Sequence, residues 1–274
     1  MSVTISASDV NKLRQATGAG MMDCRKALTE TNNDFEAAID WLRKQGQKVA
    51  AKRSDREAKE GVVIAQTTAD NKSGIVLCIS AETDFVSNNA EFVTFVKTIA
   101  NAAIENNIQT AEELNKVTIG SETVADMVND KLASIGEKIG ITRFERVNAP
   151  FVASYIHGSN RMGVLVALTK EAAEAGKDVA MQIAAMNPLA VDESSIAPET
   201  IAREREIAIE QIKAEGKPAE MAEKIAVGKV NKFLKDNTLI HQPFVKDASK
   251  TVADYLKSID VDLKVTSFVR VALG

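Results

Sequence analysis

Few residues of this chain of 274 residues could do bond chemistry, and they are scattered. The two histidines, His157 and His241, lie far from each other and from Cys24 and Cys78, so their spacing is not that of a metal site. The sequence contains no glycine-rich phosphate loop, no dinucleotide-binding glycine motif and no nucleophile elbow. It therefore predicts a protein that is not an enzyme and that uses no metal and no cofactor.

Residues 81–89 offer another kind of chemistry, the directional recognition of a protein. Residues 74–80 are short, apolar and β-branched, which is typical of a buried strand, and a helix beginning near Glu91 could be capped by Asn88 or Asn89. Asp84 and Phe85 fall at the corner between strand and helix, where rigid scaffolds present side chains outward. Either Phe85 packs in the core, with Asp84 a solvated carboxylate, or Phe85 anchors a partner, with Asp84 beside it as an acceptor.

Two other positions leave the same choice open. Met21 and Met22 follow the turn Gly18-Ala19-Gly20, and of two adjacent helical residues only one can easily face a small core. The other would present a flexible apolar surface, unless both fill gaps in the core. His157 lies in an expected turn between two strands, where it is either solvated or a contact residue at the tip of a loop.

The composition indicates a folded protein made of two or three modules, since 45% of the residues are hydrophobic and 26% are charged. A net charge of −4 gives no reason to expect a nucleic acid or an anionic membrane as the partner. No apolar run approaches the length of a membrane span, and the first residues are not those of a secretory signal. We therefore expect a cytoplasmic protein, with Cys24 and Cys78 as reduced core residues.

Helical periodicity and turn residues divide the chain into parts. Residues 1–46 are expected to form a domain of three helices, which begin near residues 8, 21 and 33. Residues 47–60 are dense in charge and are predicted to be a linker, helical at most in its first part. Its lysines and arginines are expected to be solvated rather than to bind phosphate.

Two similar units follow, at residues 61–148 and 149–274. Each contains a strand, a turn, a second strand that begins with glycine, a helix and a late closing strand, at residues 141–147 and 263–271. This internal duplication predicts an α+β core of two antiparallel three-stranded sheets, each with helices on one face. Between its helix and its closing strand, each unit carries an insertion. The first insertion contains a capping box at Thr110 and a helix over residues 121–135.

The second insertion, at about residues 193–238, is predicted to be two helices joined at Gly216-Lys217-Pro218. The expected apolar seam is narrow and consists of Ile201, Ala208 and Ile212 on one arm and Met221, Ile225, Val230, Phe233 and Leu234 on the other. Such a seam predicts an antiparallel coiled coil that projects from the body. It would contact either a partner or a second copy of the chain, as in a homodimer.

Three motifs and two flanking segments together resemble one protein family over nearly the whole chain. They are Thr17-Gly18-Ala19-Gly20-Met21-Met22-Asp23-Cys24 followed by Lys26-Ala27-Leu28, then Thr83-Asp84-Phe85-Val86, Gln242-Pro243-Phe244-Val245, Tyr155-Ile156-His157-Gly158 and Gly163-Val164-Leu165-Val166. The sequence is similar to elongation factor Ts, a family of exchange factors in protein biosynthesis that act on elongation factor Tu.

The resemblance implies an amino-terminal domain of ubiquitin-associated-like fold, a core of two parts and a coiled-coil insertion. It implies a guanine nucleotide exchange factor that binds elongation factor Tu in its GDP form, disturbs the magnesium and phosphate site, and promotes GDP release so that GTP can bind. The positions implied to contact that partner are Met21, Met22, Asp84, Phe85, Val86, Ile135, His157 and Gly158. Many members have an extra helix after the last strand, whereas this sequence stops at Gly274, so contacts from such a tail are not expected.

Two other classes of function are weaker alternatives. The amino-terminal domain alone could recruit a ubiquitin-like or ribosomal partner, which would make the chain a binding module. An enzyme would need a concave site with converging titratable groups, which no motif in the sequence indicates.

Overall fold

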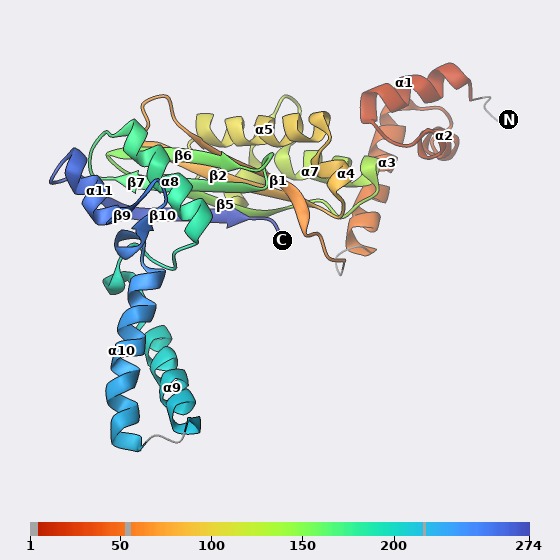
Figure 1. Ribbon diagram of the computed structural model, residues 1–274. Helices are drawn as coiled ribbons and strands as arrows, with labels where there is room; N and C mark the ends of the chain where they lie inside the picture. Colours follow the sequence, from red (N-terminus) through yellow and green to blue (C-terminus); the bar gives the residue numbers. More distant parts are fainter. Residues whose placement is uncertain (1–4, 53–55, 216–217) are drawn as a thin grey trace.

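The computed structural model describes residues 5–52, 56–215 and 218–274. It shows a core of two sheets covered by helices, a three-helix domain at one end and a helical hairpin that projects from the core (Figure 1). Residues 53–55 of the predicted linker lie outside the described residues, as do Gly216 and Lys217 of the predicted hairpin loop. No helix within the described ranges is both long and apolar enough to cross a membrane.

The amino-terminal domain consists of α1 (Ala7–Thr17), α2 (Met21–Glu30) and α3 (Phe35–Lys52). Ser6 and Asp9 form a capping box at the start of α1, and Gly18 ends this helix in the left-handed region at φ 69°. Leu13, Cys24 and Leu28 are fully buried in a small core of apolar residues. The three predicted helices are confirmed, and α3 continues past residue 46 into the segment predicted as linker.

The core contains the two antiparallel three-stranded sheets that the duplication predicts. In the first, β1 (Glu60–Thr67), β2 (Ser73–Ala81) and β5 (Gly140–Asn148) lie in the order β1-β2-β5. In the second, β6 (Phe151–His157), β7 (Met162–Leu168) and β10 (Val265–Ala272) lie in the order β10-β7-β6. In both sheets the second strand of the hairpin is central, with the closing strand beside it.

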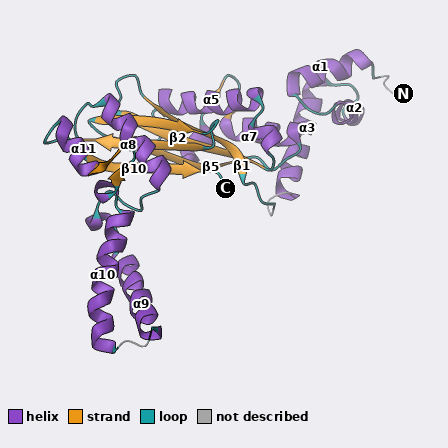
Figure 2. Ribbon diagram, viewed as in Figure 1, coloured by secondary structure: helices purple, strands orange, loops and turns teal. Residues whose placement is uncertain are grey.

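The two sheets pack face to face, and helices cover the outer face of each (Figure 2). Successive residues of β1 show why: Val62 and Ile64 belong to the cluster under the helices, whereas Val63 and Ala65 belong to the cluster between the sheets. Strands buried on both faces are apolar almost without interruption, as β2 is. The prediction of helices on one face of each sheet is confirmed, and the stacking explains what covers the other face.

Gly74 and Gly163, each the second residue of the central strand of its sheet, show why both units carry glycine at this position. A β carbon at Gly163 would lie 2.8 Å from Val63 Cγ1, and one at Gly74 would lie 3.0 Å from both Leu165 Cδ2 and Val152 Cγ1. Each glycine therefore lies where side chains of the opposite sheet leave no room for a β carbon without a shift. The two halves use the same device at equivalent positions.

The duplication extends further than predicted. The helices on the first sheet are α5 (Ala90–Glu105) and α7 (Val124–Ile135), and those on the second are α8 (Ala173–Met186) and α11 (Val252–Ile259). A small hairpin precedes the second helix of each half, formed by β3 (Thr118–Ile119) with β4 (Glu122–Thr123) and by β8 (Pro243–Phe244) with β9 (Asp247–Thr251). Short helices complete the core: α4 (Asp84–Ser87), α6 (Ala111–Lys116) and the 3-10 helices η1 (Glu193–Ser195) and η2 (Leu239–His241).

The sequence itself marks this repeat: residues 121–126 are Ser-Glu-Thr-Val-Ala-Asp and residues 249–254 are Ser-Lys-Thr-Val-Ala-Asp. In both, the threonine side chain accepts a hydrogen bond from the backbone N–H of the aspartate at the start of the helix. Treating α7 as part of an insertion was therefore wrong, because α7 is the counterpart of α11. The α11 helix was not predicted.

The projecting hairpin consists of α9 (Pro198–Ala214) and α10 (Ala219–Asn237), which lie side by side (Figure 1). Toward the tip its seam is formed by Ala208, Ile212, Ala222 and Ala226. The assignment of Met221 to the seam was wrong, since this side chain is 52% exposed. Alanines let two helices approach closely, and a search for large apolar residues overlooks them.

A buried carboxylate joins the Gln242-Pro243-Phe244-Val245 segment to α8. Asp178, which is 6% exposed, accepts a hydrogen bond from Tyr255 Oη at 2.9 Å and forms an ion pair with Lys246 Nζ at 2.5 Å. Gln182 of α8 accepts from Val245 N at 2.7 Å and donates to the Pro243 carbonyl at 3.2 Å. The chemistry of this motif is therefore structural: it fastens the β8–β9 hairpin to the second half of the core.

We expect Tyr255→Phe to lower the free energy of unfolding by about 1–2 kcal/mol, because it removes one donor from a buried carboxylate. Burial, followed by the hydrogen bond to Asp178, raises the pKa of Tyr255 well above its usual value. Since the folded chain holds this proton more tightly than the unfolded chain, the stabilisation is full below pH of about 10 and is lost as the pH rises further. Urea unfolding from about pH 8 to 11 should show the difference between wild type and variant shrinking, and a constant difference would contradict this role.

Candidate partner-binding site

The corner between β2 and α5 is a single helical turn, α4, that carries Asp84 and Phe85 outward. Phe85 is 86% exposed and Asp84 is exposed, whereas Val86 packs against the first core cluster and Ser87 is buried. The Ser87 hydroxyl donates to the Asp84 carbonyl at 3.2 Å, which tightens the turn. Of the two interpretations of Phe85, burial in the core is wrong, and the exposed position favours the anchor.

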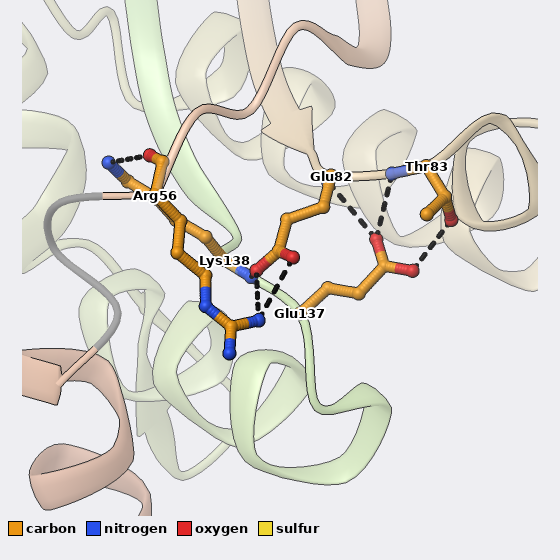
Figure 3. A network of polar contacts seen from close by, with 5 residues as sticks. All are labelled: Arg56, Glu82, Thr83, Glu137 and Lys138. Atoms are coloured by element: carbon orange, nitrogen blue, oxygen red, sulfur yellow. Dashed lines mark hydrogen bonds and ion pairs between the residues drawn. The ribbon is translucent and has the colours of Figure 1, made fainter.

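Both ends of this corner are held by side chains. At its far end, Asn89 accepts a hydrogen bond from Glu91 N at 2.7 Å and so caps α5, which decides between the two predicted capping residues. At its near end, the carboxylate of Glu137 accepts from the backbone N–H groups of Glu82 and Thr83, both at 3.0 Å (Figure 3). The corner is therefore a fixed platform rather than a loose loop.

Ile135 belongs to the segment that supports this platform, two residues before Glu137. It is the last residue of α7, is 37% exposed, and is followed by Gly136 in the left-handed region at φ 82°. Glu137 comes next and binds the Phe85 corner. The structure therefore connects Ile135 and Phe85 through one short segment.

The turn after His157 lies at the same end of the core. Gly158, Ser159 and Asn160 all have positive φ, at 59°, 51° and 66°, which is costly for the two non-glycine residues. Hydrogen bonds hold this conformation, from Val63 N to the Asn160 carbonyl at 2.7 Å and from Arg161 N to the Gly158 carbonyl at 3.0 Å. The turn is therefore fastened to β1 of the other half.

An ion pair then links this turn to the Asp84 corner. Arg161 pairs with Glu60, the first residue of β1, which lies opposite Ala81 in the register of the first sheet. The hydrogen bond and the charge of Glu60, with a smaller contribution from Asp84, raise the pKa of Arg161. The charges of Glu60 and Asp84 from the first half and of Arg161 from the second half thus interact where the two halves meet.

His157 is exposed, and its Nδ1 lies 3.0 Å from the hydroxyl oxygen of Tyr155. This hydrogen bond engages Nδ1, so Nε2 is the ring nitrogen left to contact another molecule. His157 is therefore placed as a directional contact, which favours this interpretation over a purely solvated ring.

Met21 and Met22 lie in the three-helix domain, and both are outside its core, with 53% and 74% of their surfaces exposed. The expectation that one of them faces the core was wrong, because Cys24, Ala27 and Leu28 occupy that face of α2.

This domain docks on α7 through α3. Arg43 pairs with Glu122 and lies 3.8 Å from the Asp130 carboxylate, and a β carbon at Gly46 would lie 3.0 Å from that of Ala133. The two exposed methionines thus belong to a different domain from Phe85, since they begin α2 whereas Phe85 lies in α4, and Figure 1 shows these two helices apart.

The structure brings Asp84, Phe85, Ile135, His157 and Gly158 to one end of the core. No motif indicated three residues that hold this end together, Glu60, Glu137 and Arg161. Their partners are 54 to 101 residues away along the chain, so no local spacing could reveal them.

An exposed aromatic side chain on a well-fixed corner and exposed methionines on a second domain are typical of a protein that binds another protein. Two family models match the chain: one described as elongation factor TS over residues 82–274, and one described as elongation factor Ts, mitochondrial, N-terminal, over residues 1–50. The chain belongs to the elongation factor Ts family, whose members are nucleotide exchange factors of translation elongation and not enzymes.

Full-length relatives support the assignment. The chain is 49% identical over 273 residues to elongation factor Ts of Christiangramia forsetii, an alignment that covers 98% of this chain and 99% of the relative. It is 50% identical over 274 residues to the protein of that name from Flavobacterium psychrophilum, covering 99% of each chain. The corresponding identity for Cytophaga hutchinsonii is 47% over 276 residues, again covering 99% of each chain.

Proposed function

We propose that this protein is the guanine nucleotide exchange factor of elongation factor Tu. It binds that partner in its GDP form and accelerates the release of GDP, so that GTP can bind. The observation that carries the proposal is Phe85, which is 86% exposed on a corner held at both ends. Membership of the elongation factor Ts family supports the choice of partner.

The contact surface can act on a nucleotide site in two ways. Phe85 inserts between helices of the nucleotide-binding domain, with Asp84 as a directional acceptor beside it and Val86 and Ile135 extending the apolar contact. His157 and Gly158 press on the phosphate-binding loop from the other half of the core. In a GTPase a magnesium ion bridges protein groups and phosphate oxygens, and the N–H groups of that loop cradle the phosphates. Displacing both elements removes contacts to GDP.

The other parts of the chain add contacts to the same partner. The three-helix domain, residues 1–46, is proposed to be ubiquitin-associated-like in fold and to bind through Met21 and Met22. After this domain the chain is proposed to continue with a linker at residues 47–60 and two core units at residues 61–148 and 149–274, the first of which carries Phe85. The helical hairpin, at about residues 193–238, is proposed to be a coiled-coil arm that binds the partner or a second copy of the chain.

The exchange cycle follows from thermodynamic reciprocity. If this protein weakens GDP binding by a given factor, GDP weakens the binding of this protein by the same factor. Each 1.4 kcal/mol of coupling corresponds to about tenfold in affinity. Rebinding of nucleotide therefore expels the exchange factor, which is left unchanged and can act again.

Stopped-flow release of a fluorescent GDP from elongation factor Tu tests the proposal. We expect this protein to accelerate release by a factor on the order of 10–100. A parallel experiment with the magnesium chelated should show a smaller acceleration, because the contacts to the metal are already lost. Equal release rates with and without this protein would refute the proposed function.

A further inference from the structure

We infer that Glu137 is a positioning residue of the exchange surface: its carboxylate binds the chain just before α4 and so sets the direction in which Phe85 points. This inference rests on the proposed function of Phe85. It goes further by assigning a role to a residue that acts through Phe85 and that no motif indicated.

The geometry around Glu137 is that of a clamp on the backbone (Figure 3). Its Oε2 accepts hydrogen bonds from Glu82 N and Thr83 N, both at 3.0 Å, and its Oε1 accepts from the Thr83 hydroxyl at 2.6 Å. Hydrogen bonds to an ionised carboxylate are roughly twice as strong as neutral ones. Thr83 precedes α4 in the capping position, yet its side chain does not cap α4, because its hydroxyl is directed to Glu137.

Glu82, the residue directly after β2, in turn binds the segment that follows α7. Lys138 N donates to Glu82 Oε1 at 2.6 Å, and Arg56 forms an ion pair with Glu82 at 3.1 Å (Figure 3). The Lys138 ammonium also donates to the Arg56 carbonyl at 2.8 Å. Two segments 54 to 56 residues apart are thereby joined as one unit.

The helical turn that carries Phe85 cannot set its own direction. It spans four residues, Asp84–Ser87, and a helix of one turn is unstable by itself. Its far end is held by Val86, which is partly buried against the first core cluster, and by the Asn89 cap, and its near end is held by Glu137. Without this carboxylate, two N–H groups and one hydroxyl at the near end lose their acceptor.

Without the Glu137 carboxylate, the α4 corner would sample several orientations of Phe85, and the partner would bind only the molecules in which Phe85 has the correct orientation. The apparent affinity for the partner equals the intrinsic affinity multiplied by the fraction of molecules in which Phe85 already points in the binding direction. Because Glu137 lies two residues after Ile135, the same clamp also fixes Ile135 relative to Phe85. One carboxylate thus holds two of the proposed contact residues in a common geometry.

The first test compares GDP release from elongation factor Tu with wild type, Glu137→Ala, Glu137→Gln and Thr83→Val. At concentrations below saturation we expect Glu137→Ala to lose about five- to tenfold in exchange rate. The glutamine retains one acceptor oxygen and should recover part of this loss. Thr83→Val keeps the shape and the backbone bonds and should lose about twofold.

Glu113→Ala is the matched control. The Glu113 carboxylate also accepts two backbone N–H groups, from Gln109 at 2.8 Å and Thr110 at 3.3 Å, at the start of α6. Its removal should lower thermal stability about as much as Glu137→Ala does. It should leave exchange at the wild-type rate, so a loss caused by stability alone would appear in both variants.

A double-mutant cycle separates positioning through Phe85 from an independent effect. If Glu137 acts through Phe85, Glu137→Ala should change exchange by less than about twofold in the Phe85→Ala background. Hydrogen exchange of the free protein supplies a readout that needs no partner. The amides of residues 82–88 should exchange faster in Glu137→Ala, whereas those of β1 and β2 should remain protected.

The outcomes distinguish this inference from the function on which it rests. If wild type fails to accelerate GDP release, the proposed function is overturned and the role of Glu137 with it. If wild type is active but Glu137→Ala is equally active, the positioning role alone is overturned. The same holds if Glu137→Ala loses as much in the Phe85→Ala background as in wild type.

Discussion

Phe85→Ala is expected to reduce the acceleration of GDP release about tenfold, to a small remainder of the wild-type effect, while leaving the protein folded. Truncating an aromatic anchor at the centre of an interface typically costs about 2–4 kcal/mol of binding. Because Phe85 is 86% exposed, its removal leaves no cavity in the free protein. The change should therefore appear in exchange and not in stability.

Two variants make this experiment decisive. Phe85→Leu keeps part of the apolar volume and should retain part of the activity. Phe92→Ala is the matched core control, because Phe92 is 2% exposed under the first sheet and its truncation should cost about 3–5 kcal/mol of stability. A Phe85→Ala variant that unfolds as readily as Phe92→Ala would show that Phe85 is a core residue after all.

Gly163→Val is expected to destabilise the protein by about 3 kcal/mol or more. The new β carbon would lie 2.8 Å from Val63 Cγ1, 3.1 Å from Ala65 Cβ and 3.2 Å from Val76 Cγ2. All three atoms belong to the opposite sheet, which is packed on its own outer face as well. Relieving the clash requires the valines of the opposite sheet to leave their packed positions or the two sheets to separate.

Urea unfolding measures this loss, with Gly140→Val as the control. Gly140 lies in β5, and a β carbon there would meet no heavy atom within 4 Å. We expect the control to change stability by less than about 1 kcal/mol. Similar stabilities for the two variants would mean that the sheets do not approach each other closely at Gly163.

The contact between the sheets matters for function because each half supplies one side of the proposed site. Phe85 and Ile135 come from the first half, and His157 and Gly158 come from the second. The separation of these two pairs is set by the stacking of the sheets and by the Glu60–Arg161 ion pair between the halves. A shift between the sheets would therefore change the site without altering any contact residue.

Much of the fold could be predicted because its signals are local. Caps such as Thr110 and the αL glycine at Gly136 mark helix ends within a few residues. The repeat of strands that begin with glycine showed the duplication. The equivalent Ser-x-Thr-Val-Ala-Asp segments are a weaker signal, because they are short and 128 residues apart, and only the structure shows that α7 and α11 are counterparts.

The six strands of the two large sheets, most of the helices, the duplication and a corner carrying an acidic and an aromatic residue could be predicted from the sequence alone. The tertiary structure alone decided that Phe85 lies outside the core and that Glu137 and Arg161 hold the two contact segments. The reason is physical: periodicity and capping act over a few residues, whereas burial and these hydrogen bonds join residues 54 to 101 positions apart. Such contacts exist only once the two sheets have stacked.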